Sequence, residues 1–254
     1  MIMLSLKSIY NFFILNFILS IVGITGYFIN SLNPLIILLF IILKDYGLLY
    51  LIDYGTQNKQ AIGKRKEIKE SYFMEFDSHL IGAILECGYT SLLFNSLPTS
   101  FNIFYYILNS FIFEIIFDFF HYWSHRLLHH PYLYKHIHIV HHKFKNPNSK
   151  SSFYHHPLDL ILTNVIPILL TLYLYPVDQL TFSLLMVYKT FIEIAGHTGK
   201  KINASSFVQF KWLPQILGID LKTEGHDLHH SRNKCNYGKR FKLWDKVFGT
   251  YIKN

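Results

Sequence analysis

Three clusters of histidines in this chain of 254 residues have the spacing of metal ligands. They read HYWSH from His121, HIVHH from His138 and HDLHH from His226. Residues three or four positions apart share one face of a helix, so each cluster can direct two or three imidazoles at one point. A tetrahedral zinc site takes four ligands, and a catalytic zinc often takes three. The eight imidazoles of the clusters exceed the needs of one ion, which predicts a pair of metal ions.

Imidazole ligands without a thiolate partner suit iron, zinc, copper or nickel. A single pair of histidines with this spacing is usually a surface or core feature, but three clusters in one chain reverse that interpretation. His197 stands alone after an apolar segment and is a candidate ninth ligand. His129 continues the face of His121 and His125 and is a candidate neighbour of the ligands.

Other polar residues near the clusters could orient the ligand rings. Asp118 lies one helical turn before His121, where it could accept a proton from that imidazole and fix its tautomer. Of the adjacent His155 and His156, one could line the site and the other could cap the helix that follows.

The segments that position these residues are apolar. Hydrophobic residues make up 51% of the chain and charged residues 16%, whereas soluble domains average about 25% charged. Residues 10–29 form an uncharged run of 20, the length that a membrane-spanning helix needs. This run has no small-residue cleavage site after it, so we expect an uncleaved anchor. The other apolar segments are residues 34–52, 79–97, 101–120, 160–175 and 180–195.

The pattern predicts an all-α integral membrane protein with four to six membrane helices, some half-buried or interfacial. We expect N-terminal membrane helices over residues 1–112, a catalytic region over residues 113–251, and a helical cap that carries the histidine-rich dimetal site.

The distribution of Lys and Arg predicts which side the site faces. The turns at residues 30–34, 98–100 and 175–178 contain no Lys or Arg, whereas the longer loops hold nearly all of them. Cytoplasmic loops are enriched in these residues, so the cap is expected on the cytoplasmic side, in the endoplasmic reticulum or an equivalent membrane. The basic cytoplasmic loops explain the net charge of +8. Nucleic-acid binding is not indicated, because the sequence shows no basic stripe on a soluble fold. The basic residues after the second apolar segment are Lys59, Lys64, Arg65, Lys66 and Lys69.

Two other classes of function compete with an oxidative enzyme. A histidine-rich metal transporter or storage protein is one, but the membrane segments lack the repeated internal His and Asp of an ion path. A membrane zinc hydrolase is the other, but the general-base motif H-E-x-x-H is absent. His79 and His136 are interpreted as ordinary structural residues.

Residues 114–251 resemble the fatty acid hydroxylase and sterol desaturase superfamily of membrane non-haem di-iron enzymes. The three histidine boxes match, as do HPLD from His156, NYG from Asn236 and LWDKVFGT from Leu243. The form HDLHH with the following NYG and WD is most similar to the sterol-acting branch. A fatty-acid or sphingolipid hydroxylase of the same superfamily is the alternative. Some members have another histidine one turn before the position of His197, where this chain has Glu193.

The resemblance implies two iron ions, which zinc could replace in purified protein, and dioxygen as co-substrate. It also implies a lipid substrate and a separate electron donor, such as a b-type cytochrome with its reductase. Glu193 is then either a carboxylate ligand or faces a metal-bound water. No catalytic residue beyond the ligands is implied. The implied ligands are His121, His125, His138, His141, His142, His197, His226, His229 and His230.

A lipid must reach such a site from the bilayer, so we expect a hydrophobic pocket between membrane helices that ends at the histidines. A wide pocket would favour a sterol, and a narrow tunnel would favour an acyl chain. Aromatic residues beside the first ligands are candidate walls, although core packing explains them equally well: Phe117, Phe120, Tyr122 and Trp123.

Overall fold

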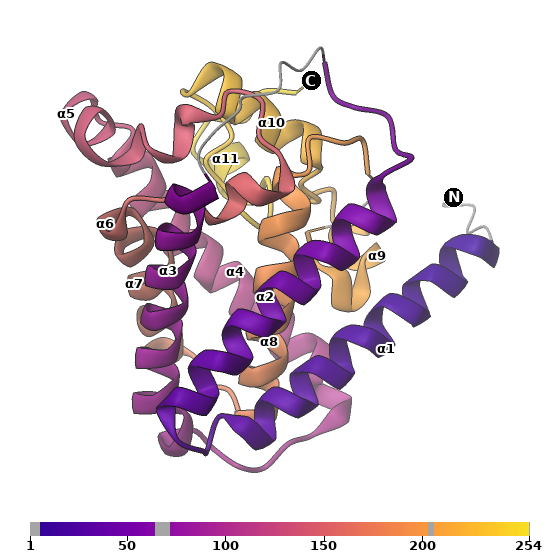
Figure 1. Cartoon of the computed structure of the whole chain (residues 1–254). Coiled ribbons are helices and arrows are strands. Elements are labelled where there is room, and N and C mark those ends of the chain that lie inside the picture. The colour runs from indigo at the N-terminus through magenta and orange to yellow at the C-terminus, as the bar shows by residue number, and fades with distance from the viewer. Residues whose placement is uncertain (1–5, 64–71, 203–205, 254) are drawn as a thin grey trace.

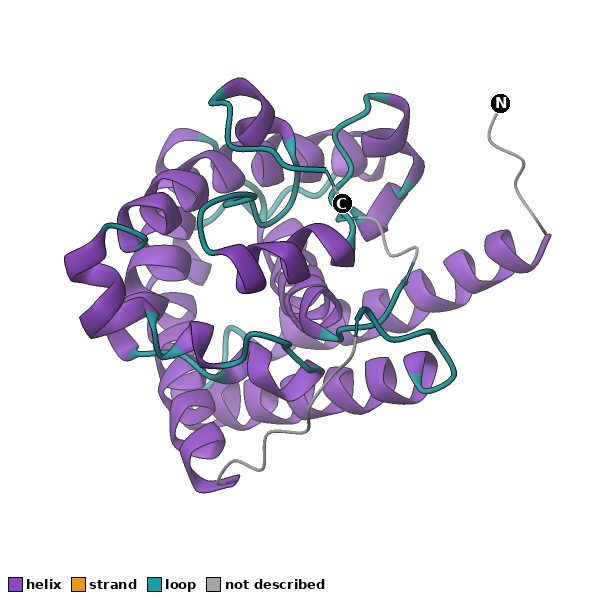
Figure 2. Ribbon diagram, turned by 90° about the horizontal axis from the view of Figure 1, so that it is seen from above, coloured by secondary structure: helices purple, strands orange, loops and turns teal. Residues whose placement is uncertain are grey.

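The computed structural model describes residues 6–63, 72–202 and 206–253 (Figure 1). These residues form helices and loops and no strand, apart from two isolated bridges, so the all-α prediction is confirmed (Figure 2). The longer helices are α1 (Leu6–Ile29), α2 (Pro34–Thr56), α3 (Tyr72–Leu93), α4 (Ile103–Leu128), α7 (Ile166–Leu174) and α8 (Gln179–His197). The shorter ones are α5 (Pro131–Leu133), α6 (Pro157–Leu160), α9 (Trp212–Ile216), α10 (Thr223–Arg232) and α11 (Leu243–Val247).

Two single turns of π-helix and four of 3-10 helix complete the helical elements. The π turns are Tyr134–His138 and Ile161–Val165, and the second joins α6 to α7. The 3-10 turns are Phe94–Ser96, His141–Lys143, Ser149–Phe153 and Val208–Phe210. Single π turns are rare and occur often at functional sites, and the first of these two contains a cluster histidine.

Polar caps begin three of the long helices at the predicted turns. The side chains of Asn33 and Asn102 accept hydrogen bonds from the backbone N–H groups two residues later, at 2.8 and 3.0 Å. Asp178 accepts one from the N–H of Thr181 at 2.9 Å. Each cap satisfies a donor that the first turn of a helix leaves unpaired.

Among the described residues, four helical segments are long and apolar enough to cross a membrane, which agrees with the predicted four to six. They are Leu6–Ile29, Pro34–Thr56, Ile103–Leu128 and Pro157–Leu174. Helix α8 packs against α1, α2 and α10 and is mostly buried. Its residues Leu184 and Tyr188 share a hydrophobic core with Leu19 of α1 and Leu48 of α2.

The long helices connect at one end of the molecule, and the short helices α5, α10 and α11 cover the other (Figure 1). The three turns without Lys or Arg lie at the first end, so the helices separate them from the cap (Figure 1). The predicted division between residues 112 and 113 falls inside α4, which runs from the connecting end to the cap. Four of the basic residues used to predict the orientation lie outside the described residues: Lys64, Arg65, Lys66 and Lys69.

Candidate metal centre

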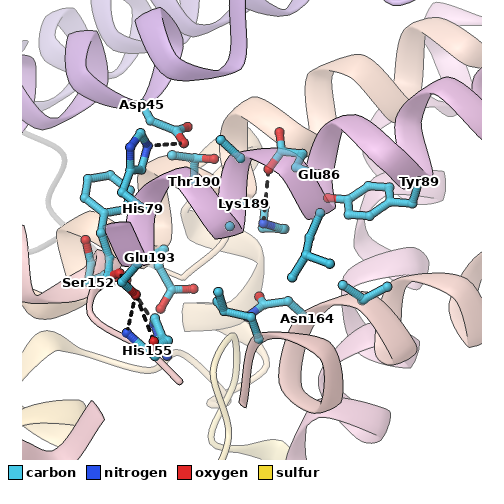
Figure 3. A pocket seen from close by; sticks show the side chains of 17 residues that line it. Asp45, His79, Glu86, Tyr89, Ser152, His155, Asn164, Lys189, Thr190 and Glu193 are labelled. Atoms are coloured by element: carbon cyan, nitrogen blue, oxygen red, sulfur yellow. Dashed lines mark hydrogen bonds and ion pairs between the residues drawn. The ribbon is translucent and has the colours of Figure 1, made fainter. Parts of the chain in front are cut away.

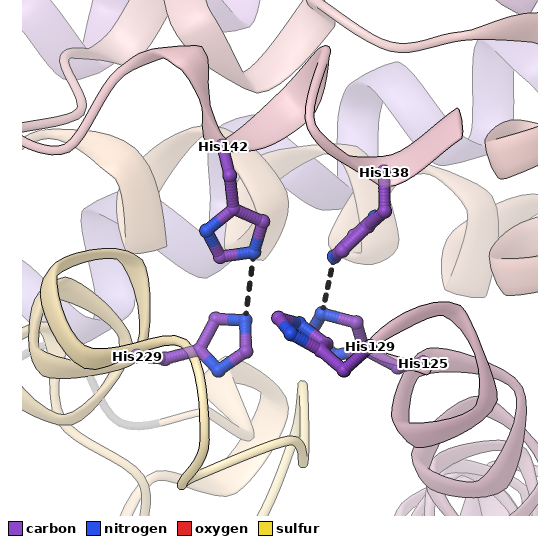
Figure 4. Close-up of side chains that lie close together, drawn as sticks. All are labelled: His125, His129, His138, His142 and His229. Atoms are coloured by element: carbon purple, nitrogen blue, oxygen red, sulfur yellow. Dashed lines mark hydrogen bonds between the residues drawn. The ribbon is translucent and has the colours of Figure 1, made fainter. Parts of the chain in front are cut away.

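Nine histidines of the cap form two groups, and in each group one ring nitrogen per residue lies within 4.8 Å of the others. The second cluster and the third each contribute to both groups, because successive residues of a helical turn point in different directions. The ring planes of His141 and His142 stand at 88° to each other, and those of His229 and His230 at 85°. The first group is His125, His129, His138, His142 and His229 (Figure 4), and the second is His141, His197, His226 and His230.

Several secondary-structure elements bring the nine rings together. Helix α4 ends at the cap with His125 in its last turn and His129 as its C-terminal cap residue. His138 ends the first π turn, and the 3-10 turn that follows begins with His141. Helix α10 carries the third cluster and stops at Asn233, which adopts a left-handed conformation with φ of 62°. His197 is the last residue of α8.

The Nε2 atoms face one another within each group. In the first group the Nε2 atoms of His125 and His138 are 3.0 Å apart, and those of His142 and His229 are 3.1 Å apart (Figure 4). In the second group the corresponding distances are 3.0 Å for His226 and His197, 3.2 Å for His230 and His226, and 3.4 Å for His197 and His141. A neutral imidazole has one nitrogen lone pair, so these contacts gather several lone pairs at two points.

Backbone carbonyls hold the opposite nitrogen of four of the nine rings. A carbonyl oxygen can only accept, so each of these Nδ1 atoms carries the proton and leaves the Nε2 lone pair free. The Nδ1 of His125 donates to the carbonyl of Tyr237 at 2.8 Å, and that of His229 to the carbonyl of Cys235 at 2.7 Å. The Nδ1 of His197 donates to the carbonyl of Glu193 at 2.7 Å. Fixed in this tautomer, the rings are prepared to bind a cation.

Asp159 orients one ring through its side chain. Its Oδ2 lies 2.6 Å from the Nδ1 of His138, and both side chains are buried. Asp159 is the last residue of the HPLD element and lies 21 residues after His138, so no local pattern links the two. A carboxylate behind a ligand imidazole fixes the ring and raises its basicity.

Asp118 does not orient His121 as expected. It accepts hydrogen bonds from the backbone N–H groups of Lys239, Arg240 and Phe241, at 2.8, 2.7 and 3.1 Å. The side chain therefore anchors the segment after the NYG element to α4. The sequence could not show this, because the two segments are more than 100 residues apart.

The sequence suggested His121 as a ligand and His129 as a neighbour of the ligands, but the structure places them the other way round. His129 belongs to the first group of nitrogens, whereas His121 belongs to neither. The Nδ1 of His121 donates to the carbonyl of Thr163 at 2.7 Å, and its side chain lines a small space between the two groups. One helical turn separates His121 from His125, and only the latter reaches the nitrogens of the first group.

His155 and His156 divide the two expected roles between them. The ring of His155 stacks on that of His141 with centroids 4.2 Å apart and an interplanar angle of 9°. The side chain of His156 accepts from the backbone N–H of Leu158 at 3.2 Å and caps α6. His136 is exposed at the surface, and His79 is buried 3.0 Å from a carboxylate oxygen of Asp45.

Glu193 forms an ion pair with Lys239 beside the second group. The ammonium of Lys239 also donates to Oδ1 of Asn164 at 3.1 Å. A carboxylate oxygen of Glu193 lies 3.8 Å from the Nδ1 of His197, on the side of the ring away from the group. Sequence reasoning missed Lys239, because the residue is 46 positions from Glu193 and no local pattern marks it.

Burial favours the neutral form of several cap histidines. It lowers the pKa of His229, which is 0% exposed, to about 3. Burial and then neighbouring imidazoles hold the pKa values of His141, His142 and His230 well below the usual range. Neutral imidazole is the form that binds metals.

Some buried ring nitrogens in the two groups have no hydrogen-bond partner among the described residues. They are Nε2 of His129 and the Nδ1 atoms of His142 and His230. An unpaired buried polar atom costs about 1–3 kcal/mol, so such atoms usually have a functional explanation. Buried imidazoles whose Nε2 atoms converge at two points fit two metal ions.

A pocket opens between α2, α3 and α8 beside this centre (Figure 3). Its walls include His155 and Glu193, which also line the space that contains His121 and His138. Unlike the expected hydrophobic pocket, it contains several charged side chains.

The aromatic residues beside the first cluster face other parts of the structure. Tyr122 is buried, stacks on Phe248 at 5.3 Å and shares a hydrogen bond of 3.0 Å with Thr250. Trp123 also packs on Phe248 and is 43% exposed. Phe117 is buried in a hydrophobic core. These three and Phe120 do not line the pocket of Figure 3, whose walls come from helices other than α4.

Comparison with known proteins agrees with this geometry. Residues 110–250, more than half of the chain, match the fatty acid hydroxylase family. The chain belongs to this family. Within the fatty acid hydroxylase family it is 33% identical over 148 residues to fatty acid hydroxylase vlmA of Lecanicillium. It is 31% identical over 144 residues to C-4 methylsterol oxidase erg25 of Schizosaccharomyces pombe, and 32% identical over 140 residues to the Delta(7)-sterol 5(6)-desaturase of Gibberella zeae.

Each of these three matches covers 55% of this chain. The matches cover 40%, 45% and 36% of the respective relatives, so the chain spans less than half the length of these curated proteins. No solved structure matches the chain. The matched region contains all nine histidines of the two groups.

Proposed function

We propose that this chain is a membrane-bound, oxygen-dependent oxidoreductase that hydroxylates or desaturates a sterol or a related lipid. The observation that carries the proposal is the pair of imidazole groups beside a pocket that opens between helices. Relatives named as sterol oxidases and desaturases favour the sterol reading over a fatty-acid or sphingolipid substrate. The relative named as a fatty acid hydroxylase keeps that alternative open.

The nine residues of the two groups would hold two iron ions, and His121 would line the space between them. Bound there, the ions supply the oxidation of an unactivated C–H bond, with dioxygen as co-substrate. Zinc could take the same places in purified protein, because zinc stands above iron in the usual affinity order.

The protein's own part is to bind, orient and exclude water. Backbone carbonyls and Asp159 hold the rings with Nε2 directed inward, so little reorganisation is needed on binding. The Lys239–Glu193 ion pair places a carboxylate beside the second group, where it can accept or hold a proton near His197. The pocket delivers the lipid between α3 and α8 to His155 and Glu193.

The proposal includes partners and an orientation. Electrons would come from a separate donor, such as a b-type cytochrome with its reductase. The cap would face the cytoplasm, in the endoplasmic reticulum or an equivalent membrane, as the distribution of Lys and Arg predicts.

Expression in a host with lipid profiling by mass spectrometry tests the proposal. The wild-type chain should give an oxidised lipid that disappears without dioxygen and in the His229→Ala variant. His136→Ala is the matched control, because this histidine is exposed and outside both groups. Metal analysis should give two ions per chain. One ion per chain at full occupancy, or a metal-dependent product that does not need oxygen, would reject the di-iron assignment.

A further inference from the structure

The pocket of Figure 3 has a polar end that lies away from the histidines. Glu86 and Tyr89 of α3 and Lys189 of α8 lie at this end, whereas His155 and Glu193 lie at the other (Figure 3). Lys189 is eight residues before His197 on α8, about 12 Å along the helix axis. The polar end and the candidate metal centre are therefore far enough apart to contact different parts of one lipid.

The charges at this end balance. The ammonium of Lys44 is paired with Glu86 and lies 3.4 Å from Asp45. The ammonium of Lys189 lies 3.6 Å from the other carboxylate oxygen of Glu86. Two cations thus face two anions, and the His79 ring lies beside Asp45. A further ion here would be buried without a counter-ion, which is strongly unfavourable inside a membrane protein. The pocket end suits a polar group without charge.

Two of these side chains retain hydrogen-bonding capacity. Lys189 has three N–H donors, and its carboxylate partner at 3.6 Å is beyond direct hydrogen-bond distance. The hydroxyl of Tyr89 is directed to Met186, whose thioether sulfur at 3.4 Å is a weak acceptor. Both side chains belong to the pocket wall, and Tyr89 is buried. By contrast, the Lys44 ammonium is enclosed by its two carboxylate partners.

We propose that Lys189 and Tyr89 bind an uncharged hydroxyl of the lipid substrate, at the end of the molecule remote from the carbon that is oxidised. The inference rests on the proposed function for the position of the reacting carbon, but the hydroxyl site itself can be tested by binding alone. An ionisable side chain as enclosed as that of Lys189, which is 14% exposed, is expensive to remove from water. A hydroxyl can accept from the Lys189 ammonium and exchange a hydrogen bond with the Tyr89 phenol.

Binding of matched lipids to the purified full chain in nanodiscs tests the site. The first pair is cholesterol and cholest-5-ene, which lacks the hydroxyl; the second is hexadecanol and hexadecane. The hydroxyl-bearing member of at least one pair should bind about 10- to 100-fold more tightly, the range expected for hydrogen bonds to charged or buried partners. Hexadecanoate should bind more weakly than hexadecanol, because its charge has no counter-ion at the pocket end.

The preference for the hydroxyl should disappear in Tyr89→Phe and in Lys189→Gln. Tyr106→Phe is the matched control, because this buried phenol lies outside the pocket and has no hydrogen-bond partner among the described residues. Tyr89→Phe removes one oxygen atom and a weak contact, so it should fold like the wild type, which thermal unfolding can check.

Equal binding of both members in both pairs, or an unchanged preference in Tyr89→Phe and Lys189→Gln, would overturn the hydroxyl site. Stronger binding of hexadecanoate than of hexadecanol would overturn the argument from charge balance. Binding needs neither iron nor dioxygen. If the wild-type chain gives no oxygen-dependent product but still prefers the lipid with the hydroxyl, the proposed function is rejected. The hydroxyl site is then retained, because it is measured by binding alone.

Discussion

The Nδ1 atom of His138 lies 2.6 Å from the Oδ2 atom of Asp159, and the two side chains are almost completely buried. The Nε2 atom of the same ring lies 3.0 Å from that of His125. Asp159 thus acts through His138 on the first group of nitrogens. This contact links the HPLD element, which lies at the start of a candidate membrane segment, to the histidine clusters of the cap.

Replacement of Asp159 by alanine should weaken metal binding at the first group. Loss of a carboxylate behind a ligand imidazole typically costs about 10- to 100-fold in metal affinity or activity. Competition with a chelator of known affinity measures the change. Asp118→Ala is the comparison, because Asp118 binds backbone N–H groups and no cluster imidazole. If Asp118→Ala weakens metal binding while Asp159→Ala does not, the roles assigned to the two carboxylates are wrong.

His129 and His121 should differ in their effect on metal content. His129→Ala removes a member of the first group, so the metal bound per chain should fall. His121→Ala removes a side chain outside both groups, so the metal content should stay close to that of the wild type. Elemental analysis of the purified variants distinguishes the two, with His136→Ala as the surface control. A loss of metal in His121→Ala with full occupancy in His129→Ala would contradict the observed grouping.

The Lys239–Glu193 ion pair should stabilise the fold. Removing one partner of a buried ion pair typically costs about 3–5 kcal/mol, because the other charge is left without compensation. We expect a clear loss of stability in Lys239→Met and a smaller loss in the double variant Lys239→Met/Glu193→Gln. Unfolding in detergent measures the free-energy differences, and the double-mutant cycle isolates the pair. Additive effects of the two substitutions would show that the residues are not energetically coupled.

Acid should destabilise the cap. Burial lowers the folded-state pKa of His229 to about 3, whereas an unperturbed imidazole titrates at 6.5. Between these values the unfolded chain binds more protons than the folded chain, so lowering the pH favours unfolding and metal release. Stability and metal content should decline as the pH falls from about 6.5 toward 3, and should vary little with this group above about 7. Titration of metal content and unfolding temperature checks this, and greater stability at pH 5 than at pH 7 would count against it.

The sequence by itself determined the class of protein and the identity of most site residues. Uncharged runs such as residues 10–29 predict membrane helices, because a bilayer requires about 20 apolar residues in series. The turns are equally local: Asn33 and Asp178 begin helices through contacts two or three residues away. The spacing within each histidine cluster is also a local feature, because residues three or four positions apart lie one helical turn from each other.

Only the tertiary structure decided how the imidazoles are divided between two groups. The chain passes from a π turn to a 3-10 turn between His138 and His141, so helical periodicity no longer gives the direction of each ring. The partners that fix the rings lie far away in sequence: Tyr237 for His125 and Thr163 for His121. Carbonyl groups occur at every residue, so no residue type marks these contacts. Packing of α4 against the C-terminal segment determines which carbonyl each ring contacts. The same packing brings His129, but not His121, into the first group.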